Sequence, residues 1–108
     1  MIGITAAADA QFDALFDAYV RDENNRALEL LVDSFAAAAS LIEGEPANPR
    51  RYPSTYTELS RYGFYWIRHH SYWYGYDLSL GYPIITNIFY VTSDMPNSVR
   101  GMGEYRIV

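Results

Sequence analysis

The sequence predicts an α+β domain in which an N-terminal strand and an antiparallel helical hairpin pack on a small antiparallel or mixed β-sheet. Residues 1–45 are rich in alanine and leucine, with apolar residues three and four positions apart, which is typical of helices. Residues 46–108 hold fourteen of the eighteen aromatic residues, in runs that are typical of strands. Half of the 108 residues are apolar or tyrosine, so we expect a single domain, 1–108, with its own core.

A short first strand is expected around Ile2 and Ile4, followed by a helix from about Ala6. Thr5 suits the cap of that helix because its hydroxyl can accept a hydrogen bond from a free N–H of the first turn. The turn formers Asp22–Asn25 are short enough to return the chain as an antiparallel hairpin. The apolar face of this first helix is formed by residues at helical spacing: Phe12, Leu15, Phe16, Tyr19 and Val20.

The second helix is expected from about Asn25 to Glu43, ended by Gly44 and Pro46. Its apolar residues cover more than half of its circumference, so it should contact two neighbours. We therefore expect it to be buried between the first helix and the sheet. The connector Pro46–Pro53 is irregular, and Tyr52–Tyr62 is left unassigned.

Aromatic and β-branched runs predict three further strands: Phe64–Arg68, Tyr72–Tyr76 and Ile84–Val91. The links between them are short, because His69–Ser71 can form a tight turn and Asp77–Tyr82 a loop that contains Gly81. Successive antiparallel pairing is therefore expected. Near the C-terminus, Tyr105 and Ile107 alternate as in a short edge strand.

Charge is distributed unevenly along the chain. Residues 1–45 carry nine carboxylates and two arginines, a net charge of −7, whereas residues 46–108 carry six arginines and four carboxylates, a net charge of +2. The overall charge of −5 argues against a broad phosphate-contacting surface, so direct nucleic-acid binding is not expected. Neither a basic leader nor a long apolar run is present, so we expect a cytoplasmic protein without a membrane span.

The sequence Arg68-His69-His70 is the one cluster with evident potential for proton transfer. Adjacent histidines in a strand or tight turn tend to point apart. This favours the interpretation that both are exposed turn residues without a shared catalytic role. With two histidines, no cysteine and no carboxylate at ligand spacing, we expect no metal site. Nucleotide-binding and nucleophile motifs are absent from the sequence, so no cofactor is expected.

The run Tyr72-Trp73-Tyr74-Gly75-Tyr76 could stack bases or anchor a peptide. On a strand, the three tyrosines share one face and Trp73 lies on the other. One of these faces must pack on the helices, and the sequence leaves open which one. Three aspartates spaced by four residues on the first helix indicate a solvated face: Asp9, Asp13 and Asp17.

Several segments together carry a family resemblance: the alternating start Met1–Thr5, the hairpin Asp9–Ile42 with Arg26-Ala27 opening its second helix, the Pro46–Pro53 connector, and the aromatic meander from Tyr62 to Phe89. Their order resembles the RelE/ParE superfamily of bacterial toxins from type II toxin–antitoxin operons. The resemblance implies a small cytoplasmic toxin that arrests growth and is neutralised by a cognate antitoxin. Members of the superfamily act either by poisoning DNA gyrase or by cleaving mRNA on the ribosome.

The sequence departs from the mRNA-cleaving type. The last predicted strand ends in Phe89–Asp94 without the basic residues or histidine expected there, and the chain contains no lysine. We therefore expect protein–protein inhibition of DNA gyrase rather than catalysis. One alternative is a ribosome-dependent endoribonuclease that uses four neighbouring residues: Arg68, His69, His70 and Tyr72. Another alternative is a phage or mobile-element interaction protein that binds a host factor through its acidic helices.

The partner-binding face is expected in the aromatic, positively charged half of the chain. An antitoxin segment is usually acidic, and arginine makes planar, bidentate contacts with carboxylates. We expect this face around the second and third of the four predicted strands, with four principal residues: Arg68, Tyr72, Tyr74 and Arg100.

Overall fold

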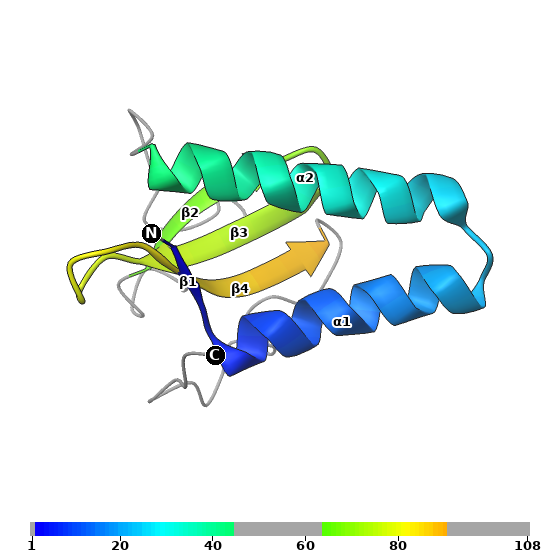
Figure 1. Cartoon of the computed structure of the whole chain (residues 1–108), viewed down its shortest axis with the longest axis horizontal. Coiled ribbons are helices and arrows are strands. Elements are labelled where there is room, and N and C mark those ends of the chain that lie inside the picture. Colours follow the sequence, from blue (N-terminus) through cyan, green and yellow to red (C-terminus); the bar gives the residue numbers. More distant parts are fainter. Residues whose placement is uncertain (1, 45–63, 91–108) are drawn as a thin grey trace.

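The computed structural model describes residues 2–44 and 64–90, which form two helices and a four-stranded mixed sheet (Figure 1). The elements follow in the order β1 (Gly3–Ile4), α1 (Ala6–Arg21), α2 (Asn25–Glu43), β2 (Tyr65–His69), β3 (Tyr72–Asp77) and β4 (Ile84–Tyr90). The predicted α+β class is confirmed. Several predictions concern residues outside the described ranges: the Pro46–Pro53 connector, Tyr52–Tyr62, Val91, the edge strand at Tyr105 and Ile107, and Arg100.

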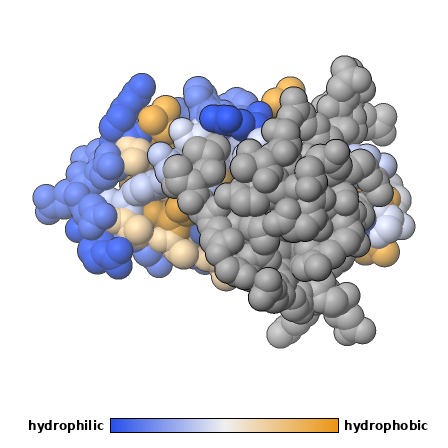
Figure 2. All heavy atoms as spheres, turned by 180° about the vertical axis from the view of Figure 1, so that it is seen from behind, coloured by the Kyte–Doolittle hydropathy of each residue, from blue (hydrophilic) through white to orange (hydrophobic). Residues whose placement is uncertain are grey.

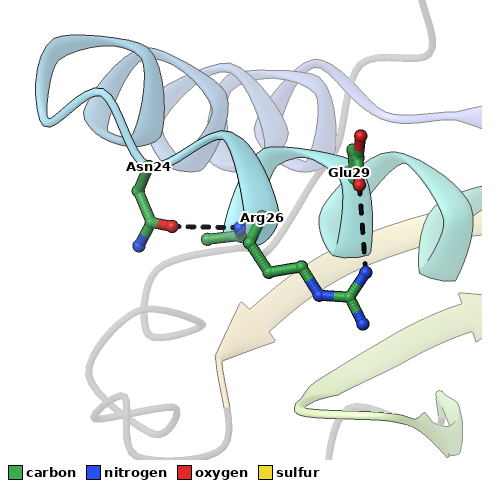
Figure 3. Close-up of polar contacts among 4 residues, drawn as sticks. Asn24, Arg26 and Glu29 are labelled. Carbon is green, nitrogen blue, oxygen red and sulfur yellow. Dashed lines mark hydrogen bonds and ion pairs between the residues drawn. The ribbon is translucent and has the colours of Figure 1, made fainter.

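Local capping explains where the two helices begin. Thr5 accepts a hydrogen bond from the Ala8 N–H at 3.1 Å, as predicted for the cap of α1. Asn24 caps α2 in the same way, because its Oδ1 accepts from the Ala27 N–H at 3.1 Å (Figure 3). Each helix then starts at the predicted residue, and a short turn between Arg21 and Asn25 reverses the chain.

The sheet has the strand order β1-β4-β3-β2. Antiparallel pairing joins β2 to β3 and β3 to β4, as predicted, whereas β1 lies parallel to β4. The β2–β3 turn contains His70 at φ 53°, and the β3–β4 loop contains Gly81 at φ 87°. Glycine suits position 81 because a positive φ strains residues that carry a Cβ.

Both helices lie side by side on one face of the sheet (Figure 1). α1 packs over β4, whereas α2 packs over β2 and β3. The expectation that α2 contacts both α1 and the sheet is confirmed. The expectation that it is buried between them is wrong, because α2 lies beside α1 in one layer and leaves Val32 and Leu41 exposed. The geometric reason is that two helices packed about 8–10 Å apart span roughly two strand spacings of about 4.8 Å, so a four-stranded sheet accommodates both in one layer.

The tyrosine face of β3 is the face that packs on the helices. Tyr72, Tyr74 and Tyr76 are buried in one cluster with Leu31 of α2 and Ile88 of β4. The opposite face of the sheet also holds buried apolar side chains. Its residues include an aromatic pair across β2 and β4, with ring centroids 6.2 Å apart: Trp66 and Phe89.

Side chains near the start of α1 bind the backbone of β4 beyond its short pairing with β1. β1 pairs only with Ile84 and Ile85. Farther along β4, the Thr86 carbonyl accepts from the Thr5 hydroxyl at 3.1 Å, and the Ile88 N–H donates to Gln11 Oε1 at 2.8 Å. These bonds satisfy backbone groups on the side of β4 that lies beyond the two residues paired with β1. Within the described residues, neither helix combines the length and apolarity needed to cross a membrane.

Candidate functional site

A pocket of about 380 Å³ lies between the hairpin and the end of the sheet nearest the hairpin turn. Figure 1 shows that this turn extends beyond the ends of the strands. From behind, hydrophobic surface at the hairpin end of the molecule lies between hydrophilic margins (Figure 2). The pocket is lined by residues of both helices, of the β2–β3 turn and of two strands: Tyr19, Asn24, Ala27, Leu30, His70, Ser71, Tyr72 and Tyr90.

Three tyrosines make one wall of this pocket. The hydroxyls of Tyr19 and Tyr72 are 2.8 Å apart and hydrogen-bonded, and the Tyr72 and Tyr90 rings meet edge to face at 5.7 Å. Burial, followed by the hydrogen bond from Tyr19, raises the pKa of Tyr72 well above its usual range. Tyr72 is therefore a neutral hydroxyl at physiological pH. It can take part in hydrogen bonding without adding charge to the pocket.

The two histidines of the β2–β3 turn lie against each other. Their ring centroids are 4.5 Å apart in an edge-to-face arrangement, so the expectation that they point apart is wrong. The cause is the backbone of His70, whose φ of 53° interrupts the alternation of side chains along the strand. Arg68 stays close to the same turn, because its Nε–H donates to the His70 carbonyl at 3.2 Å.

A buried serine of α2 lies beneath His69. The Ser34 hydroxyl is 2.9 Å from His69 Nδ1, 3.1 Å from the His69 carbonyl oxygen and 2.9 Å from the Tyr74 hydroxyl. Burial, and then the charge of His70, lowers the pKa of His69. Sequence reasoning missed Ser34, because a lone serine among the apolar residues of a helix carries no motif. Its place on the buried side of α2 was the only available signal.

The structure corrects the expected partner-binding face. Tyr74 is fully buried and Tyr72 is only 3% exposed, so neither can act as an exposed binding residue on an open face. Arg68 and His70 remain exposed, Tyr72 reaches the pocket, and Arg100 lies outside the described residues. Of the four expected binding residues, only Arg68 and Tyr72 therefore lie together at the accessible end of the sheet, on either side of the β2–β3 turn.

The hairpin, which contributes four residues to the pocket lining, also carries exposed charged side chains. The described arginines of the hairpin both lie beside carboxylates, with Arg21 and Asp22 3.8 Å apart and Arg26 and Glu29 3.8 Å apart (Figure 3). All four side chains are largely exposed, so these pairs add little stability. Among the described residues, no group of three or more metal-ligating side chains comes together.

The site combines aromatic and polar groups. A tyrosine-lined pocket opens beside the β2–β3 turn, where the rings of His69 and His70 touch and Arg68 donates to the His70 carbonyl. Such a combination of aromatic area with a few polar groups suits the binding of a side chain or a planar ligand. Comparison of the chain with protein families, curated proteins and solved structures found no match.

Proposed function

We propose that the chain is the toxin of a type II toxin–antitoxin pair and acts in the cytoplasm by protein–protein inhibition of DNA gyrase. The observation that carries the proposal is the arrangement of the fold. A strand and a helical hairpin precede three antiparallel strands, in the order on which the resemblance to the RelE/ParE superfamily rests. Fold alone does not determine function, so the chemistry of the pocket must also be considered.

The site favours binding over catalysis. Among the described residues that line the pocket there is no carboxylate and no arginine, and the chain has no lysine, so His70 is the one ionisable group there besides the tyrosines. The volume of about 380 Å³ is within the range of pockets that hold a small ligand or a side chain anchor. Tyr90 and Leu30 supply aromatic and apolar area in the pocket, and exposed Arg68 is bound to the carbonyl of His70, one of the lining residues. We expect both gyrase and the cognate antitoxin to contact this region.

Induced expression tests the proposal in cells. Growth arrest with filamentation and a DNA-damage response is expected, together with inhibition of supercoiling when the purified protein is added to purified gyrase. Exchange of a contact residue, Tyr90→Ala or Arg68→Ala, should weaken inhibition by about 2 kcal/mol, which is roughly 30-fold in concentration. Asp13→Ala on the exposed face of α1 is the matched control and should change inhibition little.

Two results would contradict this function. Cleavage of ribosome-bound message with intact supercoiling would favour the endoribonuclease. A larger effect of Asp13→Ala than of Arg68→Ala and Tyr90→Ala together would transfer the working face to the acidic hairpin. The phage or mobile-element interaction protein would then be the better explanation.

The endoribonuclease is the second candidate because one observation favours it. The ring centroids of His69 and His70 are 4.5 Å apart. Arg68 donates to the His70 carbonyl, and Tyr72 pairs with His69 across the strands that the turn joins. Two imidazoles beside a guanidinium could supply a proton acceptor, a proton donor and a positive charge for a phosphate. If this candidate is right, His69→Ala and His70→Ala should each abolish RNA cleavage while far-ultraviolet circular dichroism shows a folded chain.

A further inference from the structure

Ser34 lies at a place where two elements must share one hydroxyl group. It is fully buried on the side of α2 that faces the sheet. Three polar atoms surround its oxygen at hydrogen-bonding distance, two of them from His69 and one from Tyr74. A serine hydroxyl has one proton to donate and two lone pairs that accept, so three partners fill its capacity.

The proton count assigns a direction to each contact. The His69 carbonyl oxygen can only accept, so the Ser34 proton must go to it if that contact is a hydrogen bond. The serine oxygen then accepts twice, once from the Tyr74 hydroxyl and once from His69 Nδ1. This is the only assignment in which all three contacts are hydrogen bonds. It requires a proton on His69 Nδ1.

We infer that Ser34 is a positioning residue that fixes the imidazole of His69 as the tautomer with its proton on Nδ1, leaving the lone pair of Nε2 as a proton acceptor. The hydrogen bond made by one ring nitrogen sets the state of the other. Ser34 thus prepares His69 for the role of a base without touching any ligand itself. For its functional meaning, the inference rests on the second candidate, the endoribonuclease, in which His69 would accept the proton.

The groups around His69 agree with a neutral imidazole. Ser34 approaches from α2, Tyr74 and the paired residue Tyr72 belong to β3, and His70 lies against the ring from the turn. Arg68 is bound to the carbonyl of His70 in the same turn. None of these groups is a carboxylate that would stabilise an imidazolium. These groups therefore favour the neutral imidazole, in which Nε2 is unprotonated when Nδ1 carries the proton.

Long-range ¹H–¹⁵N NMR spectra of the histidine-labelled full chain would test the assignment directly. Above the pKa of His69, the spectrum should show a protonated Nδ1 and an unprotonated Nε2, with His69→Asn and His70→Asn used to assign the two rings. A dominant Nε2–H form, or an equal mixture of tautomers, in the unchanged chain would overturn the inference. This measurement needs no ligand and no activity.

Variants then test whether Ser34 is the cause. Ser34→Ala should replace the single tautomer by a mixture, whereas Ser40→Ala, an exposed serine of the same helix, should leave it unchanged. Tyr74→Phe keeps the ring and removes only the second donor to Ser34, so His69 should remain protonated on Nδ1. Because this variant and the unchanged chain both retain Ser34, they still test the tautomer of His69 if Ser34→Ala fails to fold. Loss of the tautomer in Tyr74→Phe would overturn the inference.

Failure of the inference can be told apart from failure of the endoribonuclease. If the Nδ1–H tautomer is observed and no RNA is cleaved, the role of Ser34 stands and the second candidate falls. If RNA is cleaved and His69 carries its proton on Nε2, the positioning role falls. If both hold, Ser34→Ala should lower the cleavage rate and move its acidic pH limit, whereas Ser40→Ala should do neither.

Discussion

Gly75 in β3 is expected to tolerate no side chain, because the indole of Trp66 occupies the space above it. A Cβ built on Gly75 would lie 2.9 Å from Cη2 and Cζ3 of Trp66 and 3.1 Å from Thr86 Oγ1, where ordinary contacts begin at 3.4 Å. Trp66 is fully buried and stacked on Phe89, so it cannot move aside freely. The change Gly75→Ala should therefore force the strands or the indole to shift.

The expected cost of Gly75→Ala is about 1–3 kcal/mol, the range observed when an extra methyl group is forced into a packed core. Each kcal/mol should lower Tm by roughly 4–8 °C in a domain of this size. Urea unfolding followed by circular dichroism measures the free energy, and thermal melting measures the shift in Tm. Gly81→Ala is a useful comparison, because Gly81 has open space around it and only its φ of 87° would be strained.

The double variant separates the steric cause from other costs. Trp66→Phe removes the ring atoms that meet the new Cβ, so Gly75→Ala should cost at least about 1 kcal/mol less in its presence. Gly81→Ala should cost the same whether residue 66 is Trp or Phe. If Gly75→Ala leaves stability unchanged, or if its cost does not depend on Trp66, the close packing of the indole on β3 is refuted.

Two further predictions concern the helix-facing core. Phe35 packs edge to face on Phe12 at 5.1 Å and is partly buried, so Phe35→Ala should cost about 3 kcal/mol in urea unfolding, and a loss below about 1 kcal/mol would contradict this packing. Burial raises the pKa of Tyr74 and of Tyr76 to about 12, against about 10 in an unfolded chain, so their stabilisation is complete below pH 10 and is lost as pH rises toward 12. Absorbance of tyrosinate should then rise together with unfolding, and tyrosine ionisation near pH 10 in a chain that stays folded would refute the burial.

Local sequence signals located the elements of the fold because the interactions that begin and end them are local. Thr5 caps α1 through a residue three positions away, and Gly81 occupies a loop whose φ favours glycine. The alternation in Tyr72–Asp77 identified a strand and placed its tyrosines on one face. The α+β class, the hairpin and the antiparallel meander could therefore be read from the residues in order.

Tertiary structure alone decided which face of each element is used. Alternation cannot tell whether Tyr74 faces solvent or helix, because that depends on which side of the sheet the hairpin covers. The contacts of Ser34 with His69 and Tyr74 join residues 35 and 40 positions apart, and no local pattern reports such a distance. The two histidines touch because of the φ of His70, which alternation does not predict. The sequence by itself determined the elements and their order, whereas the packing of the hairpin on one face of the sheet determined the core, the pocket and the contact of Ser34 with His69.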